Sequence, residues 1–312
     1  IYGSASGTCA ASPCGLVSDT GDITINAITK GTGVAFYLRN PIIANGTASL
    51  GKGNVTISAT GKQYGIYADG TTYGYVVANG NIDLIGYGGY TAATYGIYFG
   101  GGGPALTASA GGLLRSVSGN ITLSAFGYDR ALYGNSSSTN IVALAGNVVV
   151  QGAALSTNSA GTFSAATNTA IVSSYDAIYS SITGAANPRT VMPSGFATAN
   201  VGSAATAYFW GITWVGNIFA VNNPYTVTTG TAPNSGGSVT IVGSNLYAVT
   251  PQQTDTGSGV TIYDNGNVYA KGAISITGYA IGGTDVPNRI NAGTGANHGL
   301  VIWSSTTTLR SY

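Results

Sequence analysis

Charged side chains are scarce in this sequence, and glutamate is missing altogether. Of the 312 residues, 6% are charged, against roughly a quarter in an average globular domain. Nine aspartates face ten lysines and arginines, so the formal net charge is +1. A chain with so little charge attracts neither nucleic acid nor an anionic membrane surface, and we expect neither as a partner. An apolar fraction of 44% argues against intrinsic disorder.

Helical patterning is also lacking. No long stretch repeats its apolar residues with the period of an α-helix, whereas glycine, a poor helix former, accounts for 49 residues. The uncharged stretch 196–221 is long enough to cross a bilayer, but it carries several polar residues. Trp210, Ile212 and Trp214 alternate within it, which favours a strand. We therefore expect an all-β chain without a membrane span.

Cysteine and histidine are rare: Cys9 and Cys14 are the only cysteines, and His298 is the only histidine. Four residues, including Pro13, separate the cysteines, and this spacing suits a small disulfide loop. The alternative, a metal site, requires more cysteine or histidine ligands nearby. We predict a disulfide between Cys9 and Cys14, an oxidising compartment, and no cofactor. The chain starts at Ile1 rather than methionine, which indicates a processed or excised segment.

What the sequence does contain is a recurring motif of glycine, then asparagine or aspartate, then aliphatic residues at alternate positions. It predicts a tight corner that leads into a short strand with one buried face. The clearest copies begin at Gly21, Gly53, Gly80, Gly119 and Gly146. Their acidic or amide residues are separated by steps of 32, 27, 39 and 27 residues. A loose period of about 30 residues indicates a stacked-repeat protein.

Two further runs accompany each corner motif. One has a small residue, a large apolar residue and then tyrosine, as in 64–67 and 95–98, with related copies at 34–37, 130–133 and 176–179. The other is a short apolar run at 75–77, 113–114 and 141–143. Three short strands per repeat predict a coil of roughly triangular section. Stacked coils would pair each strand with its equivalents about 4.8 Å away.

The predicted fold is therefore an all-β parallel β-helix, or β-solenoid, with irregular coils of roughly 27–39 residues. We divide the chain into an entry segment with the cysteine loop at 1–20, regular coils at 21–152, looser coils or an insertion at 153–210, and further coils at 211–312. Stacked corners should form one ladder, and amide ladders stabilise such arrays. The predicted corner ladder consists of Asp22, Asn54, Asn81, Asn120, Asn147, Asn217 and Asn267.

The run Gly-Asn-Ile-Thr-Leu-Ser at 119–124, combined with the Tyr-Gly-Ile-Tyr motif, resembles the β-solenoid passengers of bacterial surface proteins. These are the filamentous-haemagglutinin-like and autotransporter-type adhesins. The resemblance is best over 21–152 and partial over 211–280. It implies a right-handed β-helix, export across the outer membrane, and a role in adhesion, biofilm or fibre formation. The steps are longer and less even than in filamentous haemagglutinin, and the resemblance transfers no residue-level binding site.

An enzyme is the less favoured interpretation. Polysaccharide-degrading β-helix enzymes need clustered carboxylates, whereas the nine aspartates are scattered along the chain. A serine or cysteine nucleophile would need His298, which we place in a turn at 297–299. We expect a non-catalytic protein.

Tyrosine is the other candidate for function, because eight of its 21 copies crowd the region 64–98. The crowding indicates either an internal aromatic ladder or a surface that contacts glycans or subunits. The candidate contact residues are Tyr87, Tyr90, Tyr95 and Tyr98.

Together these features predict an extracellular structural or adhesive β-solenoid, either a segment of a large surface adhesin or the subunit of a cell-surface filament. Its expected partners are copies of itself, or further repeats of a parent chain, stacked end to end. A glycan-binding module on the same scaffold is the alternative.

Overall fold

Alternating aliphatic and small polar residues build the strands of this protein. In β5 (Val55–Thr60), Val55, Ile57 and Ala59 are buried while the intervening side chains are half-buried. The computed structural model describes residues 15–29, 33–46, 53–68, 74–88, 95–100, 112–127, 130–134, 139–154, 209–227, 231–245, 257–262, 266–280, 297–302 and 307–312.

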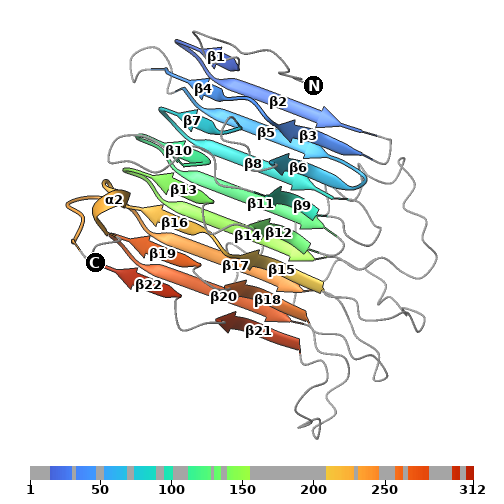
Figure 1. Ribbon diagram of the computed structural model, residues 1–312, viewed down its shortest axis with the longest axis vertical. Helices are drawn as coiled ribbons and strands as arrows, with labels where there is room; N and C mark the ends of the chain where they lie inside the picture. Colours follow the sequence, from blue (N-terminus) through green and yellow to red (C-terminus); the bar gives the residue numbers. More distant parts are fainter. Residues whose placement is uncertain are drawn as a thin grey trace, which may run out of the picture.

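The strands form three parallel sheets that run side by side along the molecule (Figure 1). Sheet 1 contains β1 (Leu16–Ser18), β4 (Ile42–Ala44), β7 (Val76–Ala78), β10 (Leu114–Ser116), β13 (Asn140–Ala143), β16 (Asn217–Ala220), β19 (Asn267–Ala270) and β22 (Thr308–Ser311). Sheet 2 contains β2 (Ile23–Ile28), β5, β8 (Ile82–Tyr87), β11 (Ile121–Gly127), β14 (Val148–Ala154), β17 (Val239–Asn245) and β20 (Ile274–Ala280). Sheet 3 contains β3 (Val34–Leu38), β6 (Tyr64–Ala68), β9 (Tyr95–Phe99), β12 (Arg130–Gly134), β15 (Phe209–Trp214), β18 (Gly257–Ile262) and β21 (Asn297–Ile302).

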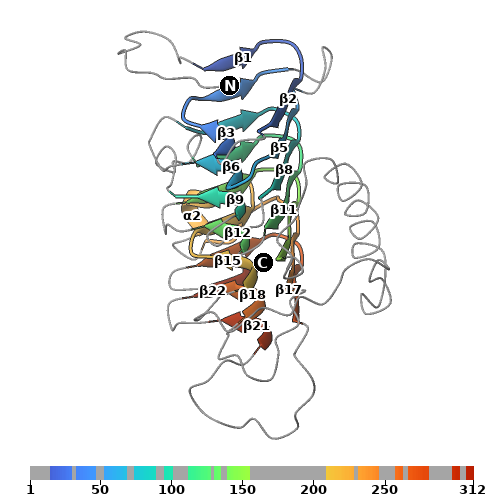
Figure 2. The same ribbon diagram turned by 90° about the vertical axis from the view of Figure 1, so that its right-hand side faces the viewer.

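Each strand pairs with the strands three places before and after it in the chain. One turn of the chain therefore contributes one strand to each sheet, and Figure 2 shows the turns stacked from the N-terminal end (blue) to the C-terminal end (red). The only described helix is the short α2 (Pro224–Val227). The prediction of an all-β parallel β-helix is confirmed.

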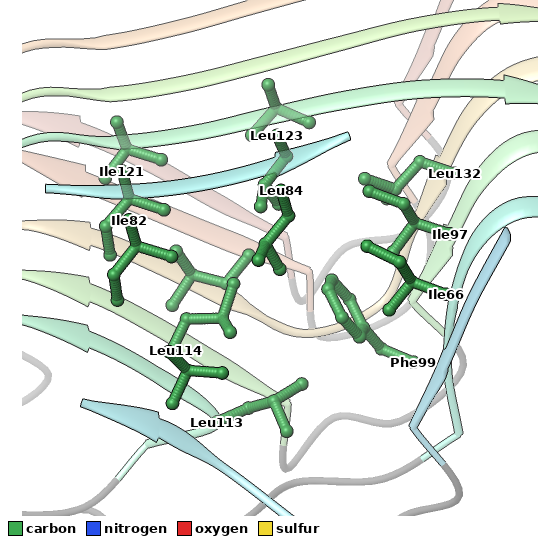
Figure 3. Packing of buried hydrophobic residues seen from close by; sticks show 14 of the residues in the cluster. Ile66, Ile82, Leu84, Ile97, Phe99, Leu113, Leu114, Ile121, Leu123 and Leu132 are labelled. Carbon is green, nitrogen blue, oxygen red and sulfur yellow. The ribbon is translucent and has the colours of Figure 1, made fainter. Parts of the chain in front are cut away.

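The core lies between the three sheets and consists of aliphatic ladders. Ile82 and Leu84 of β8 lie beside their register partners Ile121 and Leu123 of β11, and Leu84 and Leu123 lie on the side toward sheet 3 (Figure 3). The ladder of sheet 3 includes Ile66, Ile97 and Leu132, all fully buried. Burial of each such side chain stabilises the fold by about 1.5–3 kcal/mol, and no single coil could bury these residues alone.

One coil is much longer than the sequence pattern indicates. Hydrogen bonds between equivalent corners link residues 32, 27, 39, 27 and 35 apart, but one step spans 91 residues. Because β14 pairs with β17, β13 with β16 and β12 with β15, the stack has no place for another turn between β14 and β15. The step from Asn147 to Asn217 is therefore part of one coil.

The stretch considered as a membrane span contains strands where it is described. Residues 209–214 form β15 and residues 217–220 form β16, as the alternation around Ile212 predicts. Within the described ranges, no helix has the length and hydropathy needed to cross a bilayer.

Candidate functional site

Sheet 3 presents large side chains in pairs on the outside of the solenoid. In β6, β9 and β12 the first and fourth residues are half-buried, whereas the second and third are buried. Side chains three positions apart in a regular strand point to opposite faces, so these strands depart from alternation at the second position. A Cβ atom on Gly65 would lie 2.5 Å from the backbone nitrogen of Tyr87. Glycine lets β6 approach sheet 2 here, and this leaves Tyr64 and Tyr67 on the same outer face.

We define the tyrosine surface as the six half-buried tyrosines of β3, β6, β9 and β12: Tyr37, Tyr64, Tyr67, Tyr95, Tyr98 and Tyr133. Two columns of rings run along the stack. In the first, Tyr67 and Tyr98 stack with centroids 5.0 Å apart and planes 7° apart. In the second, Tyr64 and Tyr95 stack at 5.3 Å and 16°. The columns touch, because the centroids of Tyr64 and Tyr67 are 5.0 Å apart.

Arginine side chains lie over the first and the last ring of the first column. The guanidinium carbon of Arg39 lies 4.4 Å from the ring centroid of Tyr37, and the same side chain donates a 2.9 Å hydrogen bond to the Tyr37 hydroxyl. At the other end, the guanidinium carbon of Arg130 lies 4.2 Å from the ring centroid of Tyr133. Such cation–π contacts contribute about 0.5–1 kcal/mol each at exposed sites.

The ring geometry decides which chemical groups the tyrosine surface offers. The faces of Tyr67 and Tyr98 lie against each other, as do those of Tyr64 and Tyr95. The outer parts of these half-buried rings are therefore edges and hydroxyl groups, and a phenol hydroxyl both donates and accepts hydrogen bonds. The backbone positions of the tyrosines repeat at the strand spacing of about 4.8 Å, whereas the planes of Tyr37 and Tyr133 lie at 68° to Tyr67 and at 70° to Tyr98. The surface is thus a row of tyrosines at equivalent backbone positions, with two stacked pairs at its centre.

The structure places only part of the predicted contact set on this surface. Tyr95 and Tyr98 belong to it, but Tyr87 does not: it lies on β8 in sheet 2, is 8% exposed, and stacks on Phe126 with centroids 5.0 Å apart. Tyr90 lies outside the described residues. Sequence reasoning omitted Tyr37, Tyr64, Tyr67 and Tyr133 from the set, although the recurring runs at 34–37, 64–67 and 130–133 contain all four.

A hydrogen-bonded ladder runs along the corners that precede sheet 2. The Asp22 carboxylate accepts bonds from the backbone N–H and the side-chain amide of Asn54, at 2.7 and 3.1 Å. Each later asparagine side chain accepts a 2.8 Å bond from the backbone N–H of the next coil. This row joins Asn54, Asn81, Asn120, Asn147 and Ser238, so five of the seven predicted corner residues lie in one ladder.

Asn217 and Asn267 belong to a second ladder, and their assignment to the first was wrong. They begin strands of sheet 1, where Asn217 donates a 2.9 Å amide bond to Asn140, and Asn267 donates one of equal length to Asn217. The row ends where the backbone N–H of Thr308 donates to Asn267. Glycine–asparagine dipeptides occur at the start of strands in both sheets. The dipeptide alone therefore does not reveal to which sheet the strand belongs. Ser238 holds the place that we had given to Asn217.

Among the residues that the structure describes, the carboxylates do not lie together in one site. Asp19 accepts a 3.4 Å bond from Asn45, Asp22 is held by Asn54, and Asp83 lies on β8, two strands along sheet 2 from β2. No group of three or more histidine, cysteine or acidic side chains lies together there.

Arg115 is a buried, positively charged residue of sheet 1. It is 4% exposed on β10, between Val77 and Val142, and burial lowers the pKa of its guanidinium. An arginine pKa starts so high that the group stays charged at physiological pH.

Three further expectations concern the cysteines, the motif copy at 176–179 and His298. Cys9 and Cys14, with the predicted disulfide, lie outside the described residues, as does the motif copy at 176–179. His298 was expected in a turn, but it lies near the start of β21, opposite Ser258 of β18.

The sequence matches no protein-family model, and its comparison with the curated proteins and with the solved structures gives no significant similarity.

Proposed function

We propose that this chain is a non-catalytic structural or adhesive β-solenoid of the bacterial cell surface, either a segment of a large adhesin or the subunit of a filament. The distribution of exposed apolar side chains carries the proposal. Among the described residues, six of the seven large exposed hydrophobic side chains lie in strands at the two ends of the stack. They are Leu16, Val17, Ile28, Leu300, Ile302 and Leu309.

These end strands have the features that another coil needs in order to pack against them. A strand at the edge of a stack has backbone N–H and C=O groups available for pairing, and exposed apolar side chains add surface that gains from burial. Both ends consist of the same three-sheet cross-section. Further repeats of a parent chain, or a second copy of this one, would continue all three sheets without a new kind of contact.

Two observations support the non-catalytic and cell-surface parts of the proposal. The carboxylate of Asp22 accepts two hydrogen bonds within the corner ladder, which suits a structural role. The resemblance to adhesin passengers, carried by the corner and tyrosine motifs, supports export to the cell surface.

Electron microscopy of native material from the cell surface tests the proposal. We expect a continuous fibre or a long rod with layers about 4.8 Å apart and coils that meet end to end. Antibody labelling of intact cells should detect the protein outside. Discrete rods of this one chain with covered ends, or labelling only after cell lysis, would contradict the proposal.

Glycan binding on the same scaffold is a second function, which the tyrosine surface favours. It is compatible with the first, because the tyrosine surface lies on the side of the solenoid and the exposed apolar strands lie at its ends.

A further inference from the structure

We propose that the tyrosine surface binds one extended, β-linked polysaccharide chain that lies parallel to the axis of the stack. The surface runs across β3, β6, β9 and β12, which are consecutive neighbours in sheet 3. Its side chains are equivalent residues of successive coils: Tyr37, Tyr67, Tyr98 and Tyr133 share one register position. A site that repeats in one dimension fits a ligand that also repeats in one dimension.

The regular repeat of the tyrosine surface favours a polysaccharide over a folded protein as its ligand. A protein surface presents an irregular set of groups, so it would match the tyrosines of one or two strands rather than those of all four. In an extended β-1,4-linked glycan each sugar is turned over relative to its neighbour, so equivalent hydroxyl groups face the same side at every second sugar along a straight line. One sugar is similar in length to one strand spacing, so successive sugars can meet successive coils and equivalent groups can meet alternate coils.

The chemistry of the surface also fits a sugar chain. Phenol hydroxyl groups exchange hydrogen bonds with sugar hydroxyls in both directions, and ring edges contact the C–H groups between them. The central rings are held by contacts with as many as four other rings of the surface. Tyr98, for example, touches Tyr64, Tyr67, Tyr95 and Tyr133 at centroid distances of 5.0–5.8 Å. A preorganised set of side chains loses little conformational freedom when the ligand binds.

The register of sheet 3 limits the length of the site. β3 is the first strand of the sheet, and the residue that follows Tyr133 in register on β15 is the buried Thr213, so the first column ends with Tyr37 and Tyr133. The site therefore spans four strands, and affinity should rise with chain length until the sugar covers them. A disaccharide would contact the tyrosines of only two of these four strands.

Isothermal titration calorimetry with the full chain tests this proposal. Cellohexaose and chitohexaose serve as extended β-linked probes, and cellobiose and chitobiose as short ones. We expect at least one hexasaccharide to bind about tenfold or more tightly than its disaccharide. The double variant Tyr67→Phe/Tyr98→Phe keeps both rings but removes two hydroxyl groups, and it should weaken hexasaccharide binding about tenfold or more, at about fivefold per hydrogen bond.

The matched control is Tyr75→Phe. Tyr75 is also half-buried, but it precedes β7 in sheet 1, so its replacement should leave the affinity unchanged. Absence of binding by both hexasaccharides at millimolar concentration would overturn the proposal. Equal affinities of the wild type and the double variant, with both folded by circular dichroism, would overturn it as well. Neither result bears on the association of the solenoid ends, which does not involve the tyrosine surface.

Discussion

Gly53 shows what the corner before β5 demands of a residue. Its φ of 61° lies in the left-handed region, which a residue with a Cβ atom enters only with strain. A Cβ atom would also lie 2.4 Å from the backbone nitrogen of Gly46 and 2.7 Å from the carbonyl oxygen of Ala44. The chain can therefore turn into β5 beside the neighbouring corner only because this residue has no side chain.

Replacement of Gly53 by alanine should lower the free energy of unfolding by about 2 kcal/mol or more, because backbone strain adds to overpacking. Urea unfolding followed by circular dichroism measures the change. Gly33→Ala is the matched control, since a Cβ atom there meets nothing within 4 Å, and we expect a change within about 0.5 kcal/mol. Equal stabilities of the two variants would show that the corner relaxes at little cost.

Asn120 shows how the corner ladder joins one coil to the next. Its side-chain oxygen accepts a bond from the backbone N–H of Asn147, and its own N–H donates to Asn81, both at 2.8 Å. Asn120→Ala removes the acceptor and should lower the free energy of unfolding by about 1 kcal/mol. Asn120→Asp keeps an acceptor of the same shape, as Asp22 provides in the first coil, and should cost clearly less. A thermal melt in which both variants lose the same stability would contradict the role assigned to the amide oxygen.

At the scale of the strand, position in the stack decides how much a side chain contributes. Ile97 of β9 is fully buried between neighbouring coils, whereas Ile28 of β2 is 79% exposed at one end. Ile97→Ala should lower the free energy of unfolding by about 2–5 kcal/mol, because it leaves a cavity in a packed ladder. Ile28→Ala should change it by less than about 0.5 kcal/mol. Denaturant titration of the two variants checks this, and comparable losses would mean that the end coil is as well packed as the centre.

The elements that could be predicted from sequence are those with a local signal. Alternating residues such as Val55 and Ile57 reveal a strand and its inner face, and the spacing of the corners reveals the stack. The sheet that a corner feeds is not local. Asn120 and Asn217 follow glycine in the same way, yet they belong to different ladders, and the 91-residue step conceals the change.

The tyrosine surface depends on a contact that cannot be read from the spacing of residues in the sequence. Tyr64 and Tyr67 are three residues apart, so simple alternation would place them on opposite faces. Their common outer face follows from the approach of sheet 2 to Gly65, where Tyr87 and Ala59 supply the nearest backbone atoms. The motif was visible in the sequence, but the consequence of its glycine was not.

At the scale of the whole molecule, the two ends of the stack differ from its sides. A strand in the middle of a sheet has neighbours on both edges, whereas β1 and β22 each have one. Apolar side chains such as Ile28 and Ile302 lie exposed at these ends, and lysine on an edge strand discourages pairing with another chain. If the ends are built for stacking, a charge at each end should weaken association while one on the side should not.

We therefore expect the purified chain to associate end to end as its concentration rises, and Ile28→Lys/Ile302→Lys to shift it toward the monomer. Val117→Lys is the control, because Val117 is 40% exposed and follows β10 midway along the stack. Analytical ultracentrifugation gives the species present, and negative-stain images show whether rods lengthen rather than thicken. A wild type that stays monomeric at the highest attainable concentration, or equal disruption by Val117→Lys, would contradict stacking through the ends. Lengthening that only the end substitutions abolish would show that the exposed strands of the first and last coils are the contact surfaces, as continuation of three parallel sheets requires.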